Sequence, residues 1–129
     1  MVWRFIAYAL SHWQWLQDAV IQSAVKRPYF NLPGYMHRWW LLPGAAADDP
    51  KSQYRPPRWL AWLPVSIRLH YIMRPDNDRH LHDHPCNFRS IILRGYYCEL
   101  RQISAVACRS IWRQAGTTYF AKATEFHSI

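Results

Sequence analysis

The sequence predicts a mainly β fold, an antiparallel sandwich or barrel, preceded by one amphipathic α-helix. Three observations predict it: β-prone runs recur from about residue 35 onward, turn sequences such as Pro33-Gly34 separate them, and only the first part of the chain shows a helical repeat. Short strands joined by turns are typical of antiparallel architectures. We therefore expect an N-terminal helix at residues 1–27 and a β domain at residues 35–129.

The helix is predicted from apolar side chains that recur at steps of three and four between residues 3 and 26. Lys26 and Arg27 favour the negative end of the helix dipole, and Pro28 blocks continuation. We expect this helix to pack on the domain; a helix lying on a membrane surface is the alternative, because the segment contains several Trp and Tyr. The run at residues 1–16 has fewer than the roughly eighteen apolar residues that a membrane span needs and has no small-residue cleavage site, so we expect neither a membrane anchor nor a signal peptide.

The strands are predicted from alternation and from glycine breaks. Residues 65–73 alternate, with Arg68 and His70 on the more polar face. Residues 88–103 indicate one or two strands broken at Gly95, and residues 110–129 indicate two more with a turn at Gly116.

Composition narrows the class of partner. Half of the 129 residues are hydrophobic, which favours one globular domain over a disordered chain. The net charge of +8 favours phosphates, nucleic acid or small anions, but the arginines are scattered, so a small anionic molecule is favoured over nucleic acid. The three cysteines form no Cys-x-x-Cys pair, which favours a reducing cytoplasm over a disulfide framework or a zinc knuckle.

The run HLHDHP carries the strongest chemical signal. His80, His82 and His84 stand at every second position, so on a strand their imidazoles leave from the same face. Neutral imidazole binds Fe, Zn, Ni, Cu and Mn, so the spacing predicts a metal site. The alternative interpretation is that these are ordinary polar residues of a strand.

This run resembles the first motif of the cupin family, which reads Gly, five residues, His-x-His, three or four residues, Glu, six residues, Gly. With Gly95 as the closing glycine, His82 and His84 take the ligand positions and His80 falls outside. Phe88 stands where the family has its glutamate ligand, and Asp76 stands where it has the opening glycine.

The C-terminal part is similar to the second cupin motif. Counting from Gly116 places His127 on the histidine position, whereas Lys122 and Thr124 replace the family's Pro and Gly. The resemblance covers about residues 35–129 and implies a jelly-roll β-barrel that binds one divalent metal through His82, His84 and His127. More narrowly, the string around Leu-His-Asp-His-Pro is similar to small cupin-like proteins of bacteria and their phages, which implies a cytoplasmic protein of a bacterium or an infected cell.

The expected set of ligands resembles that of the three-histidine cupins, among them thiol dioxygenases. It implies an iron(II)-dependent dioxygenase acting on a small anionic substrate, with Zn, Mn or Ni as alternative metals. Arg68 and His70 are expected to hold the anionic group of the substrate. Asp78 is expected to orient one of the ligand imidazoles without binding the metal itself.

Two other classes of function stay open at this point. One is a metal-dependent isomerase or epimerase of sugars or sugar phosphates, which the arginine content would suit. The other is a binding protein, without catalysis, whose basic surface meets nucleic acid or another protein. The barrel is expected to be incomplete at the C-terminus, because cupins usually add a strand after the last histidine; a second copy in a homodimer is one way to cover the gap.

Overall fold

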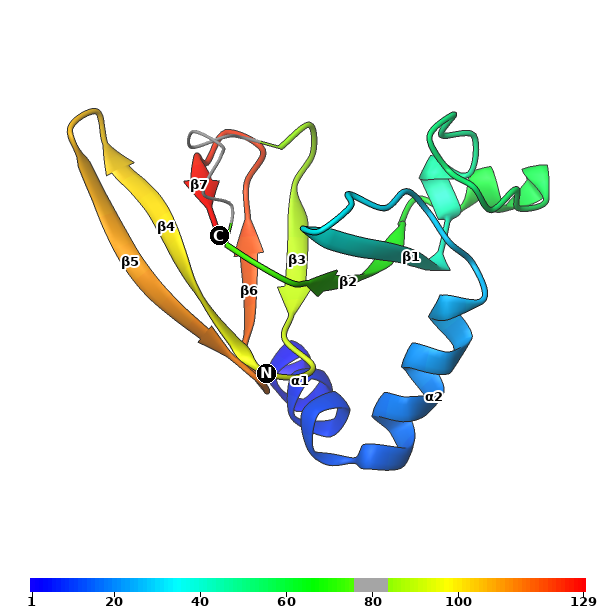
Figure 1. The fold of residues 1–129 in the computed structure, drawn as a ribbon, viewed down its shortest axis with the longest axis horizontal. Coiled ribbons are helices and arrows are strands. Elements are labelled where there is room, and N and C mark those ends of the chain that lie inside the picture. Colours follow the sequence, from blue (N-terminus) through cyan, green and yellow to red (C-terminus); the bar gives the residue numbers. More distant parts are fainter. Residues whose placement is uncertain (76–83) are drawn as a thin grey trace. The chain divides into compact units, whose positions relative to one another are not determined.

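The computed structural model describes residues 1–75 and 84–129 of the chain, and its elements are shown in Figure 1. It is mainly β, with 35% strand and 26% helix. The described residues form two compact units. Unit 1 contains residues 1–17 and 84–129, and unit 2 contains residues 18–75.

The N-terminal segment forms two helices instead of the single predicted one: α1, Val2–His12, and α2, Gln14–Val25. Trp13 between them has an extended backbone, with φ of −91° and ψ of 95°. The buried Gln17 side chain stabilises the break, because its Nε2 donates to the carbonyl oxygens of Leu10 and Leu93, each at 2.9 Å. The apolar repeat runs through Trp13 without a glycine or proline, so the sequence pattern contains no sign of this break.

Unit 2 is built on a two-stranded antiparallel sheet, β1, Met36–Leu42, with β2, Ile67–Ile72. Two short 3-10 helices, Gly44–Ala46 and Arg58–Trp62, lie between these strands in the sequence. The register places Trp40 opposite Arg68, and Trp40 is fully buried. Its indole Nε1 donates to Ser52 Oγ at 2.8 Å, and its ring packs 4.9 Å from the ring of Tyr29, measured between centroids.

Unit 1 contains two small antiparallel sheets. In one, β3, Phe88–Ile91, pairs with β6, Thr118–Ala121. In the other, β4, Tyr96–Ser104, lies between β5, Ala107–Gln114, and the short β7, His127–Ser128. Figure 1 shows β4 and β5 as one long hairpin with β7 beside β4.

The two sheets of unit 1 meet through polar as well as aromatic side chains. The hydroxyl oxygens of Tyr97 on β4 and Tyr119 on β6 lie 2.9 Å apart, and Phe88 on β3 contacts the Tyr119 ring, with centroids at 6.3 Å. Because side chains alternate along a strand, Glu99 and Arg101 share the face of Tyr97. This face of β4 therefore carries a line of polar groups into the interior.

The predicted mainly β class is confirmed, but a closed jelly-roll barrel is not found in the part of the chain that the structure describes. The strands there form sheets of two, two and three strands. Within those same residues, no helix is both long and apolar enough to cross a membrane.

Candidate functional site

Glu99, at the centre of β4, is unusual among the buried residues of unit 1, because it is a carboxylate whose side chain has 0% exposure. Its Oε1 accepts from Arg101 Nη2 at 2.9 Å and from His127 Nδ1 at 2.9 Å. Its Oε2 accepts from Arg113 Nε at 2.8 Å and lies 2.6 Å from Arg113 Nη2. Every oxygen of this carboxylate therefore contacts a cationic or N–H donor group, which is what a buried carboxylate needs.

These contacts fix the charge of Glu99. Burial alone would raise the pKa of its carboxyl, but the hydrogen bonds from His127, Arg101 and Arg113 outweigh burial and lower the pKa from 4.5 to about 2. Glu99 is therefore ionised at neutral pH. Burial, together with the neighbouring Tyr119 hydroxyl, raises the pKa of Tyr97, so this hydroxyl keeps its proton.

The lowered pKa of Glu99 predicts how stability depends on pH. Because the folded chain binds this proton more weakly than the unfolded chain, the stabilisation is complete above about pH 4.5 and is lost as the pH falls through about 2. The shift corresponds to about 3 kcal/mol of unfolding free energy. Urea unfolding at a series of pH values checks this: the acid loss should be smaller in Glu99→Gln than in the wild type. Parallel loss in both proteins would contradict the assignment.

His127 is oriented by this carboxylate. Because ionised Glu99 can only accept, His127 Nδ1 carries the proton of their hydrogen bond. The other ring nitrogen, Nε2, lies 2.5 Å from His84 Nε2. Two lone pairs at that distance would repel, so one of these two nitrogens carries a proton directed at the other. Glu99, His127 and His84 thus form a continuous hydrogen-bonded chain, which we call the Glu99 chain.

The structure brings together two of the three predicted metal ligands, His84 and His127; the third, His82, lies outside the described residues, as does Asp78. The predicted divalent metal is wrong for this structure, whether Fe(II), Zn, Mn or Ni. Among residues 1–75 and 84–129, no group of three or more His, Cys, Asp or Glu side chains could hold an ion. Glu99 beside His127 is already occupied by two arginines, so its oxygens serve ion pairs.

The predicted substrate-binding residues Arg68 and His70 lie on β2, in unit 2. The Arg68 guanidinium stacks 4.7 Å from the centre of the Tyr29 ring and 4.8 Å from that of Trp40. This gives Arg68 a packing role within unit 2. The dioxygenase and isomerase hypotheses, which depend on a metal ion, stay predictions that none of the described residues supports.

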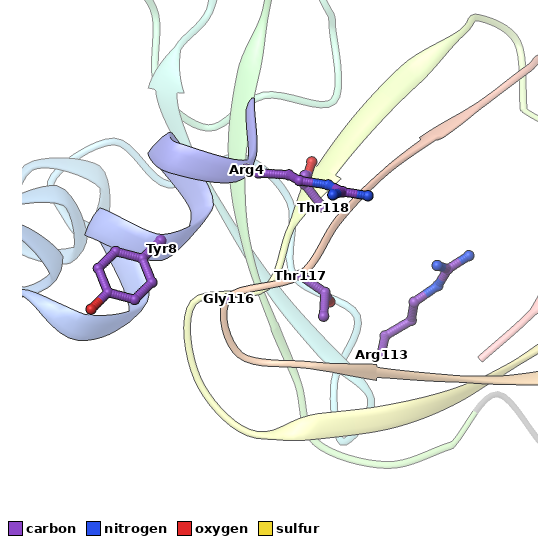
Figure 2. A pocket seen from close by; sticks show the side chains of 6 residues that line it. All are labelled: Arg4, Tyr8, Arg113, Gly116, Thr117 and Thr118. Atoms are coloured by element: carbon purple, nitrogen blue, oxygen red, sulfur yellow. The ribbon is translucent and has the colours of Figure 1, made fainter. Parts of the chain in front are cut away.

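A half-open pocket of about 430 Å³ lies between α1, β5 and the start of β6, entirely within unit 1. We call it the arginine pocket. Figure 2 shows Arg4, from α1, running past Thr118, and Arg113, from β5, rising toward the same space. Its walls are formed by Arg4, Tyr8, Arg113, Gly116, Thr117 and Thr118.

Gly116 sets the close approach of α1 at this pocket. Its φ of +84° belongs to the left-handed region, and a Cβ placed on it would lie 3.0 Å from Ser11 Oγ. A side chain at this position would strain the turn from β5 into β6 and press against Ser11, so glycine favours the close approach of Thr117 and Thr118 to the helix.

Arg113 belongs to both the Glu99 chain and the arginine pocket. Its Nε and Nη2 bind Glu99, and its carbon Cζ lies 3.9 Å from the centre of the Tyr119 ring. Among the described residues, its Nη1 and the side chain of Arg4 make no hydrogen bond or ion pair. The pocket therefore presents one guanidinium that is held in place by a buried carboxylate and a second that extends from a helix.

Glu99, Arg113 and Arg4 were not among the site residues predicted from the sequence. Glu99 carried a usable signal: an acidic residue within a β-prone run shares one strand face with Arg101, two positions away, which is the pattern of an ion pair. Arg113 could not be placed without the register of the hairpin, which sets it opposite Tyr97.

Comparison with known proteins identifies no relative of this chain. No family model matches the chain, and neither a curated protein nor a solved structure is significantly similar to it, so the resemblance to cupins stays a prediction.

Proposed function

We propose that the chain binds a small anionic molecule, with a phosphate or carboxylate group, in the arginine pocket. The observation that carries this proposal is the convergence of Arg4 and Arg113 on a space bordered by two threonine hydroxyls, with no acidic residue among the lining side chains. Guanidinium groups bind such anions through paired N–H donors, whereas the hydroxyl protons of Thr117 and Thr118 are already donated to the carbonyl oxygens of Gln114 and Ser90, so the arginines carry the binding.

The charges at the arginine pocket favour an anionic ligand. Glu99 and Glu125 balance the charges of Arg101 and Arg113, so this ion-pair group is neutral as a whole. Arg4, which lines the pocket, brings a positive charge that no carboxylate among the lining residues balances. The whole chain carries +8, which raises the local concentration of anions.

The Glu99 contacts also prepare Arg113 for binding. A free arginine loses side-chain entropy when it binds a ligand, whereas Arg113 is already held at two nitrogens and stacked on Tyr119. A volume of about 430 Å³ falls within the range of small-molecule sites and exceeds what a lone phosphate needs. The pocket therefore suits an organic anion, such as a phosphate ester.

Arg4→Ala should weaken binding of glycerol phosphate by about tenfold or more, because it removes a charge-assisted contact. Isothermal titration calorimetry on the full chain measures this. Arg109→Ala is the matched control: it removes an equal charge from an exposed position on β5 outside the pocket, and it should change the dissociation constant less than twofold.

Two results would overturn the proposal. One is the absence of saturable binding of glycerol phosphate to the wild type. The other is an equal loss in Arg4→Ala and Arg109→Ala, which would indicate a diffuse basic surface. In that case an oligonucleotide, whose binding falls steeply with salt, becomes the ligand to test.

A further inference from the structure

Four aromatic side chains near the start of unit 1 are exposed and form what we call the aromatic patch: Phe5, Tyr8, Trp13 and Trp15. Phe5 meets Trp13 edge to face, and Trp13 stacks on Trp15, with centroid distances of 6.3 Å in both pairs. The patch is therefore contiguous from α1 into the first turn of α2. Clustered exposed apolar surface of this kind marks an interaction site more often than isolated exposed residues do.

The aromatic patch adjoins the arginine pocket. Phe5 and Tyr8, three positions apart, share one face of α1, while Ala7 and Ala9 are its buried residues. Tyr8 also lines the pocket, and Figure 2 shows its ring turned away from the side chains of Arg4 and Arg113. A ligand whose anionic group sits between the arginines therefore has an apolar surface beside it.

Basic groups predominate in the segment that carries the patch. Residues 1–17 contain Arg4 and His12 but no Asp or Glu, and the nearest acidic residue in the sequence is Asp18, three positions after Trp15 on α2. Aromatic rings flanked by basic groups suit the interface of an anionic membrane, where rings lie at headgroup level and basic groups meet phosphates. A second copy of the chain would bring like charges together instead.

We propose that unit 1 docks on an anionic phospholipid surface, with the aromatic patch in the headgroup layer and a lipid phosphate in the arginine pocket. This inference rests on the proposed function, because the lipid phosphate is then the anion that Arg4 and Arg113 bind. The inference also names the source of that anion. In a phospholipid the phosphate is joined to the acyl chains, so the arginine pocket can bind the phosphate while the aromatic patch contacts the apolar part of the membrane next to it.

Co-sedimentation with vesicles tests the docking. The wild type should bind vesicles that contain phosphatidylglycerol and should bind pure phosphatidylcholine vesicles about tenfold more weakly. Trp15→Ser should reduce binding to the anionic vesicles by about tenfold, because it removes a ring from the headgroup layer. Trp112→Ser is the matched control: Trp112, on β5, is 67% exposed and Trp15 is 69% exposed, but only Trp15 belongs to the patch.

The proposal is overturned if the wild type ignores anionic vesicles, or if Trp15→Ser and Trp112→Ser bind them equally well. It is also overturned if Arg4→Ala binds them as the wild type does, because the phosphate would then lie elsewhere. Titration of Trp15→Ser with glycerol phosphate separates the two proposals. If glycerol phosphate binds normally but the wild type does not bind vesicles, the proposed function stands and the membrane docking is wrong. If neither glycerol phosphate nor vesicles bind, both proposals are wrong.

Discussion

Replacing Glu99 with Gln should destabilise unit 1 by about 3 to 5 kcal/mol, one of the two largest effects that we expect of any substitution. Gln fills the same space but leaves Arg101, Arg113 and His127 around a neutral amide. Removing one member of a largely buried ionic group leaves the remaining charges without a counter-charge in a place where little water reaches them, which costs more than the group contributed as a whole. Hydrogen exchange in urea, followed by mass spectrometry, measures the loss for the amides of unit 1 separately.

Glu125→Gln is the control for this substitution. Glu125 also contacts Arg101, at 3.5 Å, but its side chain is 36% exposed. Exposed pairs contribute little because water solvates both partners, so the expected loss is below about 1 kcal/mol. A similar loss in the two variants would show that the burial of Glu99 carries no special weight.

Trp40→Ala should destabilise unit 2 by about 3 to 5 kcal/mol. The indole is fully buried, stacks under the Arg68 guanidinium, packs against Tyr29 and donates to Ser52. Truncation would open a cavity at the centre of the unit, remove the aromatic surface below Arg68, and leave the Ser52 hydroxyl without that donor. Hydrogen exchange in urea at the amides of β1 and β2 measures the loss.

Trp62→Ala is the control for Trp40→Ala, because Trp62 belongs to the same unit and is 91% exposed. Its truncation should change the unfolding free energy by no more than about 0.5 kcal/mol. If Trp62→Ala proved as costly as Trp40→Ala, the core of unit 2 would have to lie elsewhere.

Local patterns predicted the turns and strands of this chain more successfully than its tertiary arrangement. Gly95 and Gly116, expected at breaks, both have positive φ values, 73° and 84°. The alternation in residues 65–73 correctly predicted a strand, β2, but Ile67 and Tyr71 on its apolar face are exposed. Alternation with a period of two indicates an extended backbone, whereas burial depends on what covers the sheet. Within residues 1–75 and 84–129, β2 pairs with β1 alone.

The candidate site was predictable only in part. The motif intervals selected His84 and His127, which the structure places in contact, but they could not reveal that a buried Glu99 lies behind His127. That relation depends on β7 pairing with β4, which sets His127 opposite Arg101. The arginine pocket was out of reach for the same reason, since Arg4 and Arg113 come from elements far apart in the sequence.

The division of unit 1 into two stretches of chain has a consequence for the order of folding. Unit 2 is continuous, so its strands can pair by closing loops that lie wholly within it. Contacts between α1 and β6, in contrast, close a loop that includes all of unit 2. Because long loops cost more entropy to close and slow the reactions that need them, we expect unit 2 to acquire its structure first and the arginine pocket to assemble in the last step.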